Sequence, residues 1–357
     1  MPTIFLNLKE RLMNNPADWA KAVDALSAAN KVLSDMLANA KLSERLESIE
    51  DLLANQFGKN VPGWSDTDLH FDDVIEHTAY LTNPNRFEKE YNASPYVFTS
   101  VGCRSDFFHL PLYNWWCEKL KLAPVFLRKQ WEWVYITHAL YERGMLKPGS
   151  RGIGFGVGTE PLVDLYASFG CEILATDLGA EEAEGKGWIE TAQHAADKQA
   201  LAYGLANTED FNRLVSFRPV NMNAIPDDIR GYDFCYSSCS IEHVGDLSLS
   251  KQFVENVLDV LKPGGISIHT TEFVINSDDE TVEEGNTVLW RKRDFREVAE
   301  KLRAKGHYVE PLDFYTGRHL VDKYVDLPPF GRGEPHLRLL IGKFKCTSFG
   351  LIVRKGP

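Results

Sequence analysis

Residues 151–161 read RGIGFGVGTEP, and this stretch decides the fold of the chain. A short apolar run leads into three glycines, Gly154, Gly156 and Gly158, and residues that favour a helix follow them. Glycine is needed where a strand turns tightly into a helix and where a ligand must approach the backbone closely. The helix that follows directs its first N–H groups toward the same crevice. The stretch predicts a ligand-binding strand–turn–helix unit, and a tight turn without a ligand is the plainer alternative.

Strands and helices alternate from this point onward. Apolar strands are predicted at 151–157, 171–177, 214–221, 232–238 and 265–273. Helices are predicted at 160–169, 189–206, 250–261 and 295–305, the last with Asp294 as its N-cap. Apolar strands between amphipathic helices indicate a parallel sheet covered on both faces. Two late runs, 307–314 and 345–353, predict a terminal antiparallel hairpin. We therefore expect an α/β fold with a doubly wound, Rossmann-like, seven-stranded, mostly parallel sheet.

The first 147 residues have a different character. Residues 1–57 are predicted to form a helical arm. Its apolar positions recur with heptad-like spacing at Leu42, Leu46, Ile49 and Leu53. This seam fits a homodimer formed through the N-terminal helices, and it fits equally a helix packed on its own catalytic domain. Residues 58–147 are predicted to form an aromatic-rich cap of loops and helices, whose aromatic side chains form either core or an acceptor pocket. Residues 148–357 would be the domain that binds the cofactor.

Composition narrows the classes of function. The chain has 51 acidic and 39 basic residues and a net charge of −12 at pH 7, so nucleic acid is not an expected partner. No stretch approaches the ~20 apolar residues that span a bilayer, and the charged start lacks a signal-peptide core. The six cysteines include no C-x-x-C pair, which argues against a disulfide framework or a zinc site. We expect a cytoplasmic protein with reduced thiols and no membrane partner.

Asp177 adds a second signal to the glycine turn. It ends the next predicted strand, 19 residues after Gly158. An acidic side chain at this place accepts hydrogen bonds from the ribose hydroxyls of an adenosine cofactor. Nicotinamide enzymes share both signals, although their glycines usually read G-x-G-x-x-G. The residues thus predict an adenosine cofactor. An NAD-dependent oxidoreductase and a catalytically silent scaffold that binds the cofactor stay open as alternatives.

Five stretches resemble, in order and spacing, the motifs of class I S-adenosylmethionine-dependent methyltransferases. GIGFGVGTEPL is similar to the first motif of that family, and ILATD to the acidic end of its second strand. VNMNAIPDD, YDFCYSSCSIEHV and VLKPGGISIHTTE resemble its third, fourth and fifth strand segments. The resemblance covers residues 150 to about 275 and implies a methyltransferase that uses S-adenosylmethionine. It assigns cofactor contacts to Gly154, Phe155, Gly156, Gly158, Asp177, Leu178, Asn221, Met222 and Ser238.

The chain departs from the family pattern at two positions. Gly152 stands where the family usually has an acidic residue that helps to organise the methionine end of the cofactor. Asn221 replaces the aspartate that usually follows the third strand. Its amide oxygen still accepts a hydrogen bond, so contact with the adenine amino group is retained in this interpretation.

His243 is the candidate catalytic base, with Glu242 beside it. Methyl transfer from a sulfonium is an in-line displacement, so the protein must align the reactants and exclude water. A hydroxyl acceptor must also lose a proton, and histidine titrates in a useful range. The resemblance adds that small-molecule O-methyltransferases similar to quinone-pathway enzymes often carry Glu-His at this place. We therefore expect O-methylation of a small-molecule or glycan-like acceptor. The pair would otherwise only organise the loop.

Other polar groups are open to two interpretations each. His269 and Glu272 end the fifth predicted strand, and with Glu242 and His243 they would bind a divalent cation that acidifies a hydroxyl. Strand alternation argues against that set, no dedicated ligand motif is present, and no residue is assigned to a metal. Residues 276–294 form either a flap over the acceptor or a solvated acidic loop. Glu160 contacts substrate or stabilises the start of its helix.

Overall fold

A computed structural model describes residues 98–179, 194–328, 330 and 335–357. The predicted arm at 1–57, residues 58–97 of the predicted cap and residues 180–193 lie outside the described residues.

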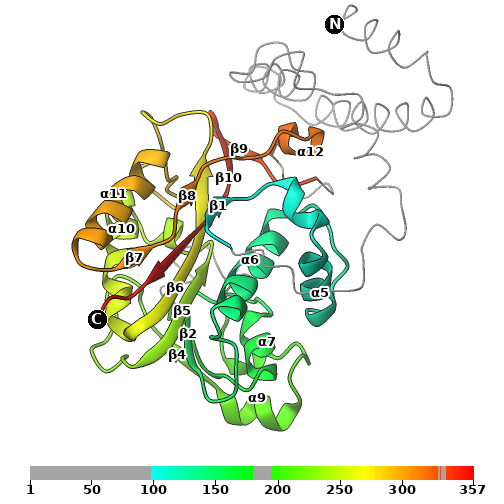
Figure 1. The fold of residues 1–357 in the computed structure, drawn as a ribbon, viewed down its shortest axis with the longest axis vertical. Helices are drawn as coiled ribbons and strands as arrows, with labels where there is room; N and C mark the ends of the chain where they lie inside the picture. The colour runs from blue at the N-terminus through cyan, green and yellow to red at the C-terminus, as the bar shows by residue number, and fades with distance from the viewer. Residues whose placement is uncertain (1–97, 180–193, 329, 331–334) are drawn as a thin grey trace, which may run out of the picture.

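A ten-stranded sheet runs through the middle of the described part of the chain (Figure 1). Its strand order is β4 (Val215–Pro219), β3 (Glu172–Asp177), β2 (Arg151–Phe155), β5 (Tyr232–Ser238), β6 (Leu261–Val274), β10 (Phe344–Arg354), β1 (Ser100–Gly102) and β8 (Leu312–Asp313). Two further strands, β7 (Tyr308–Val309) and β9 (Leu339–Ile341), pair with β10. The first five strands run parallel, and β10 runs antiparallel to its neighbours. The predicted mostly parallel α/β sheet is confirmed.

One detail of the predicted sheet is wrong. In the described part of the chain the sheet has ten strands and not seven, because β1, β8 and β9 are two or three residues long and too short to show an alternating pattern. Of the predicted terminal antiparallel hairpin, two residue pairs join β7 to β10, with residues 310–343 between them, whereas β8 pairs with β1. A tight turn at Gly342, where φ is 60°, joins β9 to β10.

The order of the parallel strands positions the site. From β2 the chain builds outward through β3 to β4, and it then returns to add β5 and β6 on the other side of β2. The loops that leave β2 and β5 therefore diverge in opposite directions. In open α/β sheets, ligands bind in the crevice at this reversal, outside the carboxyl ends of the strands.

Helices cover both faces of the sheet (Figure 1). One face carries α10 (Leu247–Asn256) and α11 (Lys292–Ala304), and the other carries α6 (Arg128–Glu142), α7 (Leu162–Ser168) and α9 (Thr208–Leu214), with α5 (Pro111–Lys119) packed outside α6. The remaining helical segments are short: α12 (Leu320–Lys323) and the 3-10 turns η2 (Ser105–His109), η3 (Lys198–Leu201), η4 (Ile241–His243) and η5 (Val257–Val260). Alternate strand residues supply two separate cores. Phe234 and Tyr236 pack beneath α6 and α7, whereas Cys235 packs beneath α10.

The helix predicted at 189–206 needs correction. Its described part consists of bends and irregular backbone apart from η3, and the helix of this region is α9, which begins at Thr208. The buried carboxylate of Asp164 explains the difference. It accepts hydrogen bonds from the backbone N–H groups of Tyr203 (2.7 Å), Leu205 (2.9 Å) and Ala206 (3.0 Å). These donors would be used within a helix, so a tertiary contact overrides the local propensity. The start of α11 also moves, because Arg291 precedes it and Asp294 is its third residue.

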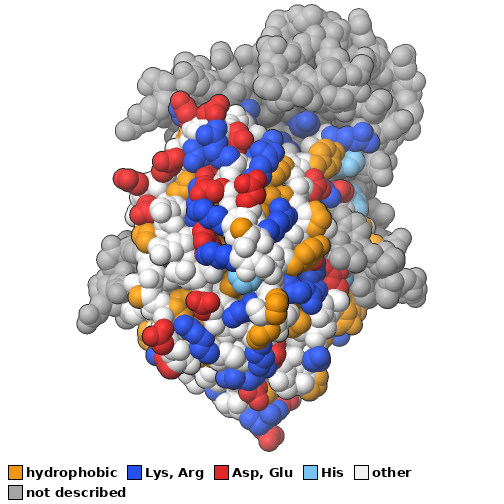
Figure 2. Space-filling view, turned by 60° about the vertical axis from the view of Figure 1, so that its left-hand side comes forward, with side chains coloured by type: hydrophobic (Ala, Val, Ile, Leu, Met, Phe, Trp, Pro, Cys, Tyr) orange, Lys and Arg blue, Asp and Glu red, His pale blue; other side chains and the backbone are white. Residues whose placement is uncertain are grey.

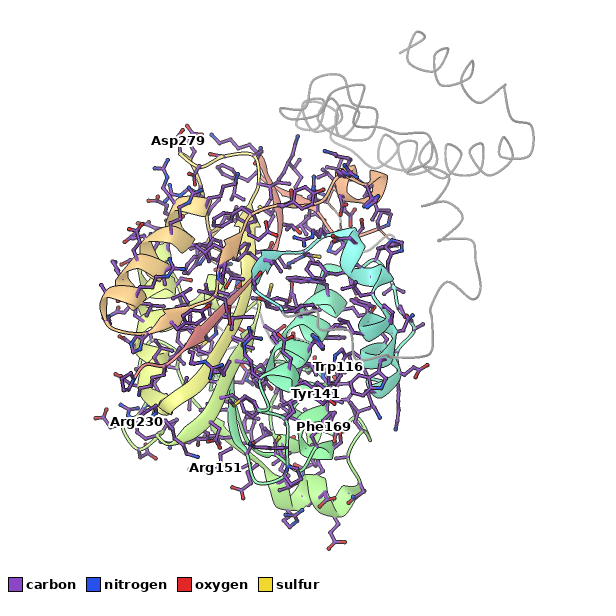
Figure 3. All side chains as sticks on the ribbon, in the orientation of Figure 1. Trp116, Tyr141, Arg151, Phe169, Arg230 and Asp279 are labelled. Atoms are coloured by element: carbon purple, nitrogen blue, oxygen red, sulfur yellow. The ribbon has the colours of Figure 1, made fainter. Side chains whose placement is uncertain are left out.

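Residues 98–147 share a core with the domain that follows them. Strand β1 pairs with β10, and α6 lies so close to that strand that a Cβ on Gly350 would lie 2.0 Å from the Tyr135 ring. Four aromatic residues of this region, Phe107, Phe108, Tyr113 and Trp116, are buried in the core, in agreement with the plainer expectation, and Trp115 is partly buried. Figure 3 shows Trp116 near Tyr141 and Phe169, where α5, α6 and α7 meet, with ring centroids 5.4 and 6.0 Å from Trp116. The boundary predicted after residue 147 therefore does not separate two cores.

Several expectations from composition can be compared with the described residues. All six cysteines are free, and all but Cys239 are buried. Within the described ranges, no helix has the length and apolarity required to cross a bilayer. On the face shown in Figure 2, Lys and Arg side chains are interspersed with Asp and Glu. A mixed face of this kind produces little net field toward a charged partner.

Candidate cofactor and acceptor site

A cavity of about 500 Å³ opens at the carboxyl ends of β2, β3, β5 and β6, where the strand order reverses. Nine of the eleven site residues predicted from the sequence line it: Gly156, Gly158, Asp177, Leu178, Asn221, Met222, Ser238, Glu242 and His243. Gly154 and Phe155 do not. Gly154 lies inside β2, and the Phe155 ring turns into the opposite core, 5.4 Å from the Phe253 ring. Strand alternation sends Phe155 away from the cavity.

The glycine turn has a steric reason at each of its three positions. Gly156 and Gly158 have φ values of 56° and 52°, in the left-handed region that disfavours residues with a Cβ. A Cβ on Gly156 would also lie 2.8 Å from the Cβ of Ser240. A Cβ on Gly154 would lie 2.6 Å from Val157 and 2.7 Å from Tyr236. The turn therefore presents bare backbone toward the cavity, as the sequence predicted.

Asp177 connects the turn to the neighbouring strand. Its Oδ2 accepts hydrogen bonds from the backbone N–H groups of Gly158 and Ala195, each at 3.1 Å, and its Oδ1 accepts one from Leu178 at 2.8 Å. Burial raises the pKa of this carboxyl, and the three N–H donors oppose that effect. Asp177 thus holds the glycine turn in shape and also borders the cavity.

The segment after β4 forms the side of the cavity next to the glycine turn. Asn221 Oδ1 accepts a hydrogen bond from the backbone N–H of Asn223 at 2.9 Å, which closes a turn. Asn223 Nδ2 donates to the carbonyl oxygen of Val244 at 2.8 Å and joins this turn to the loop after β5. Met222 Sδ would lie 3.6 Å from a Cβ on Gly156. The amide oxygen of Asn221, which was expected to contact adenine, thus already accepts a backbone hydrogen bond.

Helix α6 contributes a charged wall that the sequence interpretation missed. Arg128 and Lys129, in the first turn of α6, line the cavity, and Glu132 lies fully buried behind them. Lys129 Nζ lies 2.9 Å from Glu132 Oε2, and Arg128 Nη1 lies 3.4 Å from Glu132 Oε1. Burial alone would raise the pKa of Glu132, but the two cations outweigh it and lower the pKa to about 2. The signal in the sequence that could have indicated this wall was three charged residues close together at the start of a mostly apolar helix.

Cys239 directly follows β5 and has a strained backbone conformation beside this wall. Its φ is 45°, which is uncommon for a residue other than glycine. The thiol donates to Glu132 Oε1 at 3.0 Å, and the backbone N–H donates to the carbonyl oxygen of Thr270 at 3.1 Å. Such strain often marks a functional site, because the surrounding structure must stabilise it.

Two carboxylates face the cavity beyond Cys239. Arg128 Nη2 lies 2.5 Å from Glu272 Oε1, and Thr271 Oγ1 donates to Glu242 Oε2 at 3.0 Å. Burial raises the pKa of Glu272 to about 7, and Glu242 adds to this effect while Arg128 opposes it. Candidate ligand atoms of Cys239, Glu242 and Glu272 lie within 4.8 Å of one another. The guanidinium of Arg128 already pairs with Glu272, however, and its charge would repel a cation bound there.

The cation set predicted from the sequence does not assemble, because His269 lies elsewhere. Its Nδ1 is 2.7 Å from Ser237 Oγ and its Nε2 is 2.6 Å from Ser267 Oγ. The ring is fully buried, packs 5.5 Å from the Phe253 ring, and has its pKa lowered to about 3 by burial. Residues 269 and 272 point to opposite faces of β6, so strand alternation separates them.

His243 lines the cavity and is held in one tautomer. Its Nδ1 lies 2.6 Å from the carbonyl oxygen of Asn286. A carbonyl only accepts, so Nδ1 carries the proton and Nε2 of the neutral ring bears the lone pair. Burial lowers the pKa of His243 to about 4, although the bond to Asn286 opposes it. Residues 276–294, considered above as a flap, are joined to this loop, since Val288 donates to the carbonyl oxygen of Glu242 at 2.9 Å.

A segment between α12 and β10 closes the cavity from another side. Phe330, His336, Leu339 and Ile341 line it. The backbone of His336 pairs with that of α6, since its N–H donates to Phe126 at 2.7 Å and its carbonyl accepts from Arg128 at 3.0 Å. Nothing in the local sequence indicated this, because the contact joins residues about 200 positions apart.

Comparison with known proteins gives similar solved structures only. No family model matches the chain, and no curated protein matches it. The [4+2]-cyclase SpnF is 16% identical with a TM-score of 0.41, over 62% of this chain and 80% of that one. The methyltransferase domain of bacterial CtHen1 is 16% identical with a TM-score of 0.41, over 64% and 99%. Phosphoethanolamine N-methyltransferase 2 of Haemonchus contortus is 17% identical with a TM-score of 0.39, over 62% and 52%.

These three TM-scores all lie below 0.5, so the fold is assigned from the strand order of the sheet itself. Five parallel strands reverse their order between β2 and β5, and an antiparallel strand follows β6. The glycine turn and the acidic strand end lie on adjacent strands at that reversal. This chain has the fold of the class I S-adenosylmethionine-dependent methyltransferases.

Proposed function

We propose that the chain is an S-adenosylmethionine-dependent methyltransferase that methylates a hydroxyl group of a small-molecule or glycan-like acceptor. The observation that carries this proposal is a single cavity lined by two chemically different groups of residues. The glycine turn and Asp177 line it, and so does His243, whose Nδ1 is fixed by a carbonyl oxygen. A cofactor and an acceptor bound in this one cavity would lie next to each other.

The residues around the glycine turn fit an adenosine-containing methyl donor. Asp177 Oδ1 accepts one backbone N–H, which leaves a lone pair for a ribose hydroxyl. The thioether of Met222 offers a polarisable surface for a flat base next to the bare backbone of Gly156. S-adenosylmethionine, when bound here, supplies a methyl group that is already activated as a sulfonium. The protein therefore has to orient the acceptor, exclude water and remove one proton.

His243 is the proposed base, and Glu242 positions it. With Nδ1 protonated, Nε2 is the atom that would take the proton of an acceptor hydroxyl. The bound cofactor would supply the methyl group, and the electrons of the broken carbon–sulfur bond would stay on sulfur, which leaves S-adenosylhomocysteine. The low pKa keeps the imidazole neutral at pH 7, so it is ready to accept. Glu242 fixes the loop through Thr271 and the backbone of Val288. Phe330, Leu339 and Ile341 provide apolar surface that limits water in the cavity.

Calorimetric titration with S-adenosylhomocysteine and, separately, with NAD tests the cofactor. We expect binding of the first and no response to the second. Asp177→Ala should abolish binding, whereas Asp227→Asn should not, because Asp227 lies in an exposed ion pair with Arg230. Binding of NAD without binding of S-adenosylhomocysteine would refute the proposal in favour of an oxidoreductase.

Transfer of labelled methyl groups to a panel of phenols, catechols and sugars tests the reaction. Native mass spectrometry of the purified protein would identify any acceptor or cofactor that co-purifies. His243→Gln should lower turnover by about 10²- to 10⁴-fold, the usual contribution of general base catalysis. A protein that binds the cofactor but transfers no methyl group to any acceptor of the panel would favour the silent scaffold.

A further inference from the structure

Charged side chains surround Ser238 in the cavity, and one of them, Glu160, directly follows the glycine turn. Lys129 Nζ lies 2.9 Å from Glu132 Oε2, 3.2 Å from Glu160 Oε1 and 3.4 Å from Ser238 Oγ. Glu160 Oε2 is buried and makes no hydrogen bond with any described residue. A buried carboxylate oxygen without a donor is costly, so this atom indicates a missing partner.

A buried hydrogen-bond donor in the same cavity also lacks a partner. Trp133 follows Lys129 by one turn of α6, so the two side chains share a face, and both line the cavity. The indole Nε1 of Trp133 is buried and donates to no described residue. The cavity therefore offers an unsatisfied acceptor on Glu160 and an unsatisfied donor on Trp133. A zwitterion supplies both complements, because it carries an ammonium group and a carboxylate.

The position at which the family usually carries its acid is filled in this chain. A Cβ on Gly152 would lie 2.2 Å from Cζ and 2.4 Å from Cε2 of Phe234. That ring is fully buried in the core beneath α6 and α7. No acidic side chain fits at position 152 unless Phe234 moves. Recognition of an ammonium group must come from another element.

We propose that Glu160 binds the ammonium group of the amino-acid moiety of the cofactor, while Trp133 and Lys129 of α6 bind its carboxylate. This inference rests on the proposed function, because it concerns the same cofactor. Glu160 can turn toward a ligand, since Oε2 has no hydrogen-bond partner among the described residues and Oε1 pairs with Lys129 at 3.2 Å. Lys129 supplies positive charge beside the cofactor carboxylate. The glycine turn and α6 thus hold the amino-acid moiety from two sides.

Two ligands separate this inference from the proposed function. S-adenosylhomocysteine contains the amino-acid moiety, and 5′-methylthioadenosine keeps the nucleoside and the sulfur but lacks it. Calorimetry with the full chain should show S-adenosylhomocysteine binding at least about 10-fold tighter, as expected for charge-assisted hydrogen bonds. If neither ligand binds, the proposed function fails and the inference fails with it. If both bind with equal affinity, the proposed function stands and the inference is overturned.

Variants locate the effect. Glu160→Gln should weaken S-adenosylhomocysteine about 10-fold or more and leave 5′-methylthioadenosine unchanged. Trp133→Phe should weaken S-adenosylhomocysteine about 10-fold or more, the effect of one hydrogen bond to a charged group, with the same selectivity. Glu172→Gln is the matched control, because Glu172 is exposed at the start of β3. Equal weakening of both ligands, or no weakening, would overturn the assignment. The comparison of the two ligands in the unaltered protein decides the matter if a variant does not fold.

Discussion

Glu132→Gln should cause a large loss of stability. The new side chain has nearly the same size, so the main change is the loss of one buried negative charge. Glu132 is fully buried and faces two cations, with Lys129 at 2.9 Å and Arg128 at 3.4 Å. Cys239 and Ser348 also donate hydrogen bonds to its Oε1. Glutamine retains one acceptor oxygen for these donors but no charge for the cations.

The expected loss follows from the pKa. Its fall from 4.5 to about 2 corresponds to about 3 kcal/mol in favour of the charged form, at about 1.4 kcal/mol per pKa unit. Broken buried ion pairs typically cost about 3–5 kcal/mol. Lys129 keeps Glu160 and Arg128 keeps Glu272 as partners, so we expect the lower end, about 3 kcal/mol. The folded pKa lies below the unfolded one. The contribution is therefore present above pH 4.5 and is lost as pH falls toward 2.

Urea unfolding of the full chain, followed by circular dichroism, measures this loss as a fall in midpoint at constant slope. The difference between the original protein and Glu132→Gln should be constant from pH 8 to 5 and should shrink below pH 4.5. Glu118→Gln is the control, since Glu118 is exposed on α5 and its loss should cost less than about 0.5 kcal/mol. A loss below about 1 kcal/mol for Glu132→Gln, or one independent of pH down to 3, would refute the reasoning.

Three further outcomes are expected. In ¹⁵N–¹H spectra of the imidazoles, His243 should show a protonated Nδ1 and remain neutral down to about pH 4, because burial lowers its pKa; an ordinary titration near 6.5 would contradict the assigned environment. Gly156→Ala should weaken S-adenosylhomocysteine and lower stability by about 1–2 kcal/mol, since φ is 56° and the new Cβ would meet Ser240; unchanged melting and affinity would show that the turn is not constrained. Removal of divalent metal ions with EDTA should leave methyl transfer unchanged because Arg128 already pairs with Glu272; activity restored by added Mg²⁺ would instead assign a cation to Cys239, Glu242 and Glu272.

The glycine turn and the acidic strand end beside it could be predicted because their sequence signals are local. Gly156 and Gly158 have positive φ, and the backbone conformation of a turn depends on the residues of the turn itself. Asp177 follows from the same logic, since parallel neighbours place their carboxyl ends at one edge of the sheet. Phe155 was assigned to the site from a motif match, which does not say which face a side chain takes, and its ring packs against Phe253 instead of lining the cavity. The helix at 189–206 was also wrong, since Asp164 captures its N–H groups from outside the segment.

The sequence by itself determined the parallel α/β sheet, the glycine turn and the acidic strand end, because periodicity and turn chemistry act over a few residues. Only the tertiary structure decided the rest of the site. Arg128 and Glu132 reach it from a helix that precedes β2, and His336 reaches it from a segment that follows β8. It also placed His269 in the core and Glu272 at the cavity, although three positions separate them. Contacts between distant segments depend on how the elements pack, and no local pattern of residues encodes that packing.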